Sequence, residues 1–562
     1  MSRYAPQIAA GSALNEITAS LVAGENIKKG DLVTLGGADG LGYYAVEPTM
    51  SRPDLRPIMR QSEIYDYGLA DATIVATAAT STNGYEGCTS ILLDDNAMVI
   101  GYFNGANSKR EFVIVNADGT LRKGATAITN ANRSSSPSCV SLAKLKSGGF
   151  VVAAFDTTGP WVGVYDAQGS VIKAPASVDG TLATSATFSD ISCVALSGGG
   201  FVVAWATSLG QKYQVFNADG TQVTASSTLS TSAASGPRVI ALSAAQDGGF
   251  FAGWVLSVSP YGAQVGKFDA AGVLQVSKQI STSGSDTANK KIRIATLKGG
   301  GLIAMYNPAP SAGVYLAIYD GALNIQGGLQ QPDTTYTHTG VAPLFDVVAL
   351  SDGNAAAVFI GSVSTPSGSS TATTFYAYAM KFSPTGVVLV PKTIIYTNAT
   401  VNTGGTYQAF PAANGGFFFA ISSYSGGESA PGSVYVAVDS VLNVKSRRNL
   451  GGSAAACAPS VFEVPNAYDP RLGCYLAIWN ENSSMGNGVI KFQFIAPYMQ
   501  SMIPVGVAKA DTAKGARIPL TVAGVAKLRF TFKANMVADY SANFAQKFSI
   551  IGDTAILKGI QA

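Results

Sequence analysis

Residues 191–225 contain four short apolar segments separated by turn residues. The four segments read ISCVAL at 191–196, GGFVVAW at 199–205, KYQVF at 212–216 and QVTA at 222–225. The turn NADGT at 217–221 separates the last two. Alternating apolar residues bounded by glycine, asparagine and aspartate predict short β-strands, here named A to D. The Asn-Ala-Asp-Gly step predicts a tight turn between strands C and D, with Gly220 at positive φ.

The same four-part unit recurs at a spacing of about 50 residues. The start of strand B recurs eight times, at Ala97-Met98, Gly149-Phe150, Gly200-Phe201, Gly249-Phe250, Gly301-Leu302, Asn354-Ala355, Gly416-Phe417 and Cys474-Tyr475. The C–D turn recurs seven times, at Asp118-Gly119, Gln168-Gly169, Asp219-Gly220, Ala271-Gly272, Leu323-Asn324, Thr385-Gly386 and Leu442-Asn443. The last unit therefore lacks a fourth strand, and residues 72–78 (ATIVATA), which precede the first unit, are expected to complete it.

Four strands per repeat at this period predict an all-β protein built as a β-propeller, in which each blade buries its faces against its neighbours. The count favours eight blades, with seven as the alternative. A solenoid or a row of tandem sandwiches would also repeat in this way. The shared closing strand favours the ring, because a ring leaves no open end.

Large side chains recur four residues after the start of strand B. They are Tyr102, Ala154, Trp205, Trp254, Tyr306, Phe359, Ile421 and Trp479, and six of the eight are aromatic. A residue type repeated in almost every blade predicts packing between blades rather than a ligand site.

Trp161 departs from this pattern, because the preceding Thr158-Gly-Pro indicates a B–C loop. The B–C loops are long and rich in Ser, Thr, Gly and Asn, and Ser362 to Thr374 is one of them. Variable polar loops on a rigid ring are a usual place for recognition, so Trp161, Tyr261 and Tyr424 are the candidate ligand-binding residues. The same composition also suits a solvated face that binds nothing.

The two ends of the chain contain short alternating strands that could not bury a core separately. The chain is therefore expected to divide into the first half of a small β-barrel at 1–55, a propeller at 60–497, the second half of the barrel at 498–530 and an assembly arm at 531–562. Because the ends of a closed ring lie near each other, the two halves are expected to pair.

This split module carries a family resemblance. AGENI at 23–27 and GDLV at 30–33, together with IPVGVA at 503–508 and KGARIPL at 514–520, resemble the small β-barrel of phage capsid-decoration proteins and phage tail-fibre ends. The propeller repeat resembles repeats of bacterial and phage surface proteins. The phage β-barrel family usually runs through the two halves without a large insertion, whereas this chain has the propeller between them. The resemblance implies a tailed-phage virion protein whose barrel anchors and whose propeller projects.

Catalysis has little support in the residues. His338 is the only histidine, no glutamate lies between Glu111 and Glu428, and charged residues make up 13% of the chain with a net charge of +3. A multi-histidine metal site is therefore excluded, and paired carboxylates of the glycosidase type are not evident. The turns at Asn116 and Asn217 resemble fragments of calcium loops, but turn chemistry explains all seven copies. We expect no enzyme activity, no metal and no cofactor.

The five cysteines are expected to be reduced core residues, and the start of the chain lacks the apolar core of a signal peptide. No apolar run approaches the ~18 residues that span a bilayer. We therefore expect synthesis in a host cytoplasm and residence in a virion, as a homo-oligomer. The expected partners are other virion proteins and a host surface polysaccharide or protein, without nucleic acid. A tail or fibre component is the first hypothesis, a capsid-decoration protein the second, and a propeller-type polysaccharide hydrolase or lyase the third.

Overall fold

The structure is a computed structural model, and all regular elements among the residues that it describes are β-strands. The described residues are 9–10, 17–22, 32–35, 43–46, 67–68, 73–77, 88–104, 109–116, 120–128, 140–156, 159–179, 188–231, 239–256, 262–281, 291–307, 313–333, 345–367, 370–398, 407–412, 415–422, 433–451, 457–464, 474–482, 488–496, 504–508, 517–527, 536–539, 547–551 and 554–558. In this part of the chain no helix is long and apolar enough to cross a membrane.

Seven consecutive units each form a four-stranded antiparallel sheet in which the order of strands follows the chain. Their strands are β7 (Cys88–Leu92), β8 (Met98–Asn104), β9 (Lys109–Val115) and β10 (Leu121–Ala127) in blade 1; β11 (Val140–Lys144), β12 (Phe150–Phe155), β13 (Pro160–Tyr165) and β14 (Val171–Ser177) in blade 2; β15 (Phe188–Ala195), β16 (Phe201–Thr207), β17 (Gly210–Phe216) and β18 (Ser227–Ser230) in blade 3; β19 (Ile240–Ala244), β20 (Phe250–Leu256), β21 (Gly262–Phe268) and β22 (Leu274–Ser281) in blade 4; β23 (Lys291–Thr296), β24 (Leu302–Asn307), β25 (Val314–Tyr319) and β26 (Ile325–Asp333) in blade 5; β27 (Phe345–Ala349), β28 (Ala355–Ser367), β29 (Ser370–Phe382) and β30 (Val388–Asn398) in blade 6; and β31 (Tyr407–Pro411), β32 (Phe417–Ser422), β33 (Ser433–Val438) and β34 (Val444–Gly451) in blade 7.

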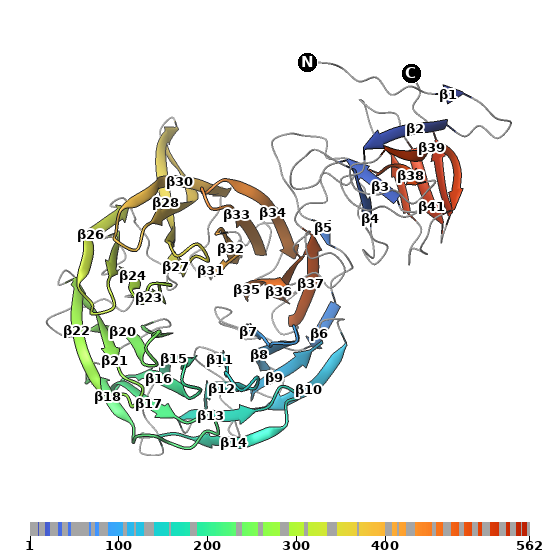
Figure 1. Cartoon of the computed structure of the whole chain (residues 1–562). Coiled ribbons are helices and arrows are strands. Elements are labelled where there is room, and N and C mark those ends of the chain that lie inside the picture. The colour runs from blue at the N-terminus through green and yellow to red at the C-terminus, as the bar shows by residue number, and fades with distance from the viewer. Residues whose placement is uncertain are drawn as a thin grey trace. The chain divides into compact units, whose positions relative to one another are not determined.

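The eighth blade is completed by the predicted closing strand. It contains β35 (Cys457–Val464), β36 (Cys474–Asn482) and β37 (Gly488–Ala496), and β37 pairs with β6 (Thr73–Thr77) and with β5 (Tyr67–Gly68). Figure 1 shows the sheets arranged around a central axis, with strand A innermost and strand D outermost. The prediction of an eight-bladed propeller is confirmed.

The repeated position in strand B lies in the core, as predicted. All eight of its residues are buried, from Ala154 at 0% exposure to Trp254 at 3%. Trp205 packs in a cluster with Val151, Ala153 and Phe155 of the preceding blade. Each blade thus covers the next one with large side chains, and truncating such a residue to alanine typically costs about 3–5 kcal/mol.

The C–D turns are held by their first residue, as turn chemistry predicts. Asp166 Oδ1 accepts hydrogen bonds from the backbone N–H of Gln168 and Ser170, both at 2.8 Å, and the aspartates at 269, 320 and 439 repeat this arrangement. Gly220 has the predicted positive φ of 80°. In the two Leu-Asn turns the positive φ falls on Leu323 and Leu442 instead, at 60° and 66°.

One predicted loop is a strand pair. Ser362 to Thr374 was expected to be a B–C loop, but β28 and β29 continue through it with pairs from Ser362↔Phe375 to Ser367↔Ser370. Threonine is β-branched and favours extended backbone, so a Ser/Thr-rich segment can lengthen a hairpin. The result is the long hairpin that projects from blade 6 in Figure 1.

Strands from both chain ends form one sheet. β2 (Ile17–Val22) and β3 (Leu32–Leu35) come from the start, and β38 (Pro504–Ala508) and β39 (Arg517–Lys527) from the end. β2 pairs with β39, and β3 with β38, which confirms that the two halves pair. The remaining strands of the sheet are β1 (Ala9–Ala10), β4 (Tyr43–Val46), β40 (Met536–Asp539), β41 (Lys547–Ile551) and β42 (Thr554–Lys558).

The predicted assembly arm at 531–562 contributes strands to this terminal sheet, since β42 pairs with β39. Its strands are therefore part of the module rather than a separate extension. Closure of the sheet into a barrel stays a prediction. The chain divides into two compact units. One consists of residues 73–463 and 477–492, and the other of residues 1–72, 464–476 and 493–562.

Cys193 is a buried free thiol, and burial raises its pKa to about 12. This agrees with the expected reduced core cysteine. Cys88, Cys457 and Cys474 lie on strands, and Cys139 lies outside the described residues.

Candidate binding face

The two ends of the blades differ in character. Because the strands are antiparallel, the A–B and C–D turns share one face of the ring, here called the turn face, and the B–C and D–A connections share the other, here called the loop face. The turn face consists of short hydrogen-bonded turns such as Leu145 to Gly149 and Asp166 to Ser170. On the loop face only blade 3 has a B–C turn, at Ser208 and Leu209, that is described throughout.

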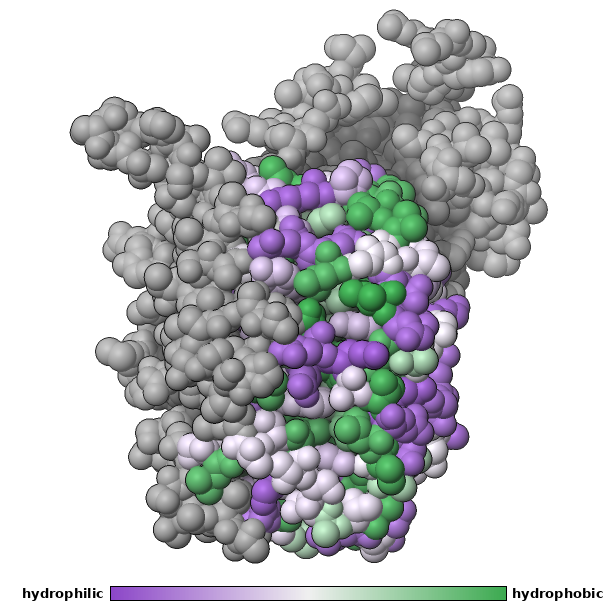
Figure 2. Space-filling model, turned by 90° about the vertical axis from the view of Figure 1, so that its left-hand side faces the viewer, coloured by the Kyte–Doolittle hydropathy of each residue, from purple (hydrophilic) through white to green (hydrophobic). Residues whose placement is uncertain are grey.

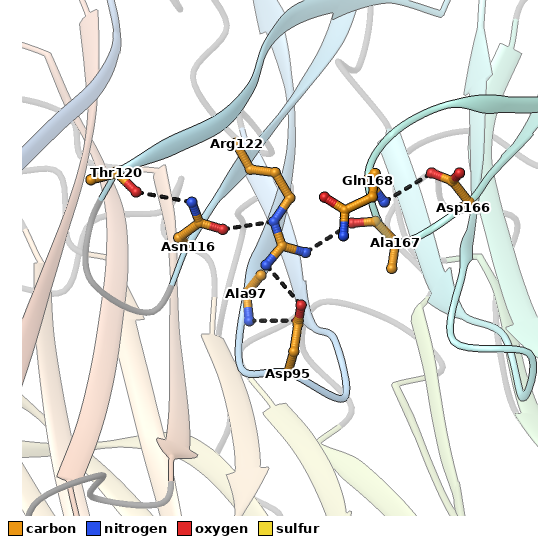
Figure 3. Close-up of polar contacts among 8 residues, drawn as sticks. All are labelled: Asp95, Ala97, Asn116, Thr120, Arg122, Asp166, Ala167 and Gln168. Atoms are coloured by element: carbon orange, nitrogen blue, oxygen red, sulfur yellow. Dashed lines mark hydrogen bonds and ion pairs between the residues drawn. The ribbon is translucent and has the colours of Figure 1, made fainter.

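Arg122 shows how the turn face is stabilised (Figure 3). Its guanidinium contacts Asp95 Oδ2 at 2.7 Å in its own blade and donates to the carbonyl of Ala167 in the next blade at 2.9 Å. It also donates to Asn116 Oδ1 at 2.6 Å. Burial opposes ionisation of Asp95, but the hydrogen bond from Arg122, the backbone N–H of Ala97 and the charge of Arg122 together outweigh burial, so the pKa of this carboxyl lies below its ordinary value.

This junction contact recurs at six successive blade junctions. In each, a strand C or D side chain donates to a carbonyl in the C–D turn of the next blade. The pairs are Arg122 to Ala167, Lys173 to Gly220, Tyr213 to Gly272, Lys267 to Gly321, Gln330 to Gly386 and Lys381 to Ser440. The polar groups of the turn face are therefore largely used within the ring itself.

The loop face carries most of the buried polar side chains. Of the thirteen buried polar or charged residues in the described part of the chain, ten lie where a strand begins or ends at this face. They are Arg110, Glu111, Asp156, Asp179, Asp190, Thr207, Gln211, Lys291, Asn307 and Asp346. Because a buried charge needs partners to offset desolvation, this end of the ring is a polar layer made by the strand ends.

Two carboxylates of this layer are paired with side chains beside it. Glu111 Oε2 accepts from Tyr102 Oη at 3.1 Å and from Asn104 Nδ2 at 2.9 Å. Burial and this carboxylate raise the pKa of the Tyr102 hydroxyl. Lys212 Nζ lies 2.8 Å from Asp179 Oδ2, across the junction of blades 2 and 3.

Two carboxylates of strand A link blades through backbone groups. Asp190 accepts from the N–H of Ile240 at 3.0 Å, and Asp346 accepts from the N–H of Ala409 at 2.8 Å. Asp346 also lies 3.5 Å from Arg293 Nε. In the described part of the chain no three metal-ligating side chains gather, so what this layer presents is hydrogen-bonding groups.

Trp161 lies elsewhere than expected. It is the second residue of β13, paired with Ala154 and Ser177, and is partly buried. The B–C connection ends earlier because Pro160 itself begins the strand, where its missing N–H is tolerated. Tyr261, Tyr424 and His338 lie outside the described residues. Sequence reasoning missed the buried polar layer, although Asp156 and Lys291 each directly flank an apolar run.

No protein-family model and no curated protein matches the chain. Solved structures with a similar fold include puromycin hydrolase, at 14% identity and a TM-score of 0.38 over 72% of this chain, and the BP39L lectin from Burkholderia pseudomallei, at 11% and 0.40 over 64% of this chain and 98% of the lectin. The polysaccharide lyase Uly1 aligns at 10% and 0.36, over 85% of this chain and 99% of the lyase. The chain spans 60% of the length of puromycin hydrolase. Similarity at this level carries no information on activity or ligand.

Proposed function

We propose that this protein is a non-catalytic structural component of a tailed-phage particle, anchored by its terminal sheet, whose propeller contacts the host surface through the loop face. The observation that carries the host-contact part is the placement of ten of thirteen buried polar residues at that face. The anchoring part is supported by the family resemblance of residues 23–33 and 503–520, of which 32–33, 504–508 and 517–520 lie in strands that pair in the terminal sheet.

Two acceptors on the loop face favour a polar ligand. Gln211 Oε1 and Asn307 Oδ1 are buried without a hydrogen-bond partner, in residues that are 0% and 5% exposed. A buried acceptor without a donor costs about 1–3 kcal/mol. Both residues lie at strand ends next to a B–C connection, so hydroxyl or amide donors of a host polysaccharide or protein that opens these strand ends on binding would offset that cost.

A cryo-EM reconstruction of the intact particle tests the anchoring part. Density for this chain on the tail or its fibres is the expected result. Density on every capsomer would instead make the protein a capsid-decoration protein, and its absence from the particle would overturn both assignments.

Host contact is tested by measuring adsorption of the purified chain to host cells. Asn307→Ala removes the unpartnered acceptor, and we expect adsorption to weaken at least tenfold while the melting temperature stays the same or rises. Ser147→Ala changes an exposed residue of the turn face and serves as the matched control. Equal adsorption by all three proteins would refute the role of this part of the loop face.

A further inference from the structure

Exposed aliphatic side chains gather at one level of the propeller wall. Fourteen large apolar side chains are well exposed in the described part of the chain, and thirteen lie at strand D or in the C–D turn before it. They are Leu121, Val171, Ile172, Val223, Val273, Leu274, Ile325, Leu329, Val387, Val388, Leu389, Ile394 and Val441, here called the aliphatic belt. Leu209, in the B–C turn of blade 3, is the exception.

The belt follows the repeat, because each of blades 1 to 7 contributes at least one residue. Figure 2 shows apolar residues as a stripe along the wall of outer strands. Blades 5 and 6, which are neighbours in the ring, contribute six members between Ile325 and Ile394, more than any other neighbouring pair of blades 1 to 7. Scattered exposed aliphatics are normal on a protein surface, whereas a contiguous patch marks a contact.

The outer strands are poorly suited to backbone pairing with another chain. All seven D strands of blades 1 to 7 pair with strand C through register shifts, and β18 is only four residues long. Pro175 lies within β14, and Pro391 and Lys392 lie within β30. Shifts, prolines, lysines and short strands are the features that keep an edge strand from pairing. A partner of this wall therefore docks on side chains rather than by adding a strand.

We propose that the belt sector over blades 5 and 6 packs against the same sector of a second copy of this chain. At roughly half exposure, the six aliphatic side chains of the sector present on the order of 500 Å² of apolar surface, which is more than half of the roughly 800 Å² per partner in a standard interface. The polar turns beside them supply the rim that makes up the rest.

A second copy fits because a twofold contact places each belt on an identical belt with the same spacing between blades. Each apolar row then meets an apolar row of equal repeat. With a net charge of only +3 on 562 residues, two copies approach without strong repulsion.

Sedimentation equilibrium of the purified full chain tests the proposal, because it measures mass and dissociation constant in solution. We expect wild type to associate to at least twice the 57.6 kDa of one chain at tens of micromolar. Val387→Lys with Leu389→Lys should raise the dissociation constant at least tenfold, since each buried cation would lack a partner. Leu209→Lys, at 59% exposure but off the belt, should leave the dissociation constant unchanged.

A monomeric wild type at 100 micromolar would overturn the proposal, as would an oligomer that the double variant leaves intact, since the contact would then lie elsewhere. Circular dichroism keeps the test clear of misfolding, and if the double variant does not fold, Val388→Thr with Leu389→Thr preserves strand propensity and replaces it. Adsorption to host cells is a separate readout, so this proposal and the proposed function can fail independently.

Discussion

Leu323 combines a buried side chain with a strained backbone, and Leu323→Gly sets these two effects against each other. The residue has a φ of 60° and a side chain with 0% exposure, in the cluster that joins blades 4 and 5. Glycine relieves a left-handed strain of about 1–2 kcal/mol. Losing a buried leucine costs about 2.7–5 kcal/mol, and glycine adds roughly 0.5–1 kcal/mol by loosening the unfolded chain. Burial therefore outweighs strain, and we expect a net loss of about 2–4 kcal/mol.

Differential scanning calorimetry of the full chain measures this loss. With an unfolding entropy near 2.1 cal/mol/K per residue over the roughly 400 residues of the propeller unit, the melting midpoint should fall by about 2–5 °C. Leu323→Met keeps both the strain and the burial and should change the midpoint by less than half as much. Leu442→Gly, with a φ of 66° and 1% exposure, should repeat the effect of Leu323→Gly. An unchanged or raised midpoint in Leu323→Gly would refute the reasoning, because backbone strain would then exceed the value of burial.

Three further predictions concern single contacts. Arg122→Met keeps the apolar stem but leaves the Ala167 carbonyl without its donor. Hydrogen exchange at the Gly169 amide, which donates to the Asp166 carbonyl in that turn, should therefore speed up about tenfold. The Gly272 amide serves as an internal control, and equal exchange at Gly169 in wild type and variant would count against the contact. The hydrogen bond from Lys267 is the main cause that lowers the pKa of Asp247 below its ordinary 3.8. The Asp247 carboxylate therefore stabilises the fold above pH 3.8, and its contribution is lost as the pH falls through the lower pKa of the folded state. Asp247→Asn should flatten the pH dependence of the melting midpoint below about pH 4, and an unaltered slope would contradict this. Burial raises the pKa of the Cys193 thiol to about 12, so the native chain should resist alkylation by iodoacetamide at pH 8. Peptide mass spectrometry should find Cys193 unmodified in the native chain and alkylated in denaturant. Alkylation in the native chain would mean that the core around Cys193 opens.

The repeat was readable from the sequence because local chemistry and burial agree in it. Strand B is apolar on both faces, since a blade is covered on both sides, and each C–D turn needs a capping residue and a positive φ. The errors came where composition and strand propensity disagree. Residues 362–374 have the composition of a loop but the β-branched threonines of a strand. Gly159-Pro160 suggested a loop that includes Trp161, whereas the strand already begins at Pro160.

The candidate face was less readable, because a buried polar residue acquires its meaning from a neighbour in another blade. Asp190 looks like an ordinary polar residue at a strand start, and only the ring brings the Ile240 N–H within 3.0 Å of it. The same limit applied to the turn face, where one contact is made by arginine, lysine, tyrosine or glutamine from either of two strands. What the repeat preserves there is a carbonyl of the backbone, whose position depends on the turn and not on the side chain. A ring of divergent blades can therefore keep these six junctions closed while the side chains that close them change.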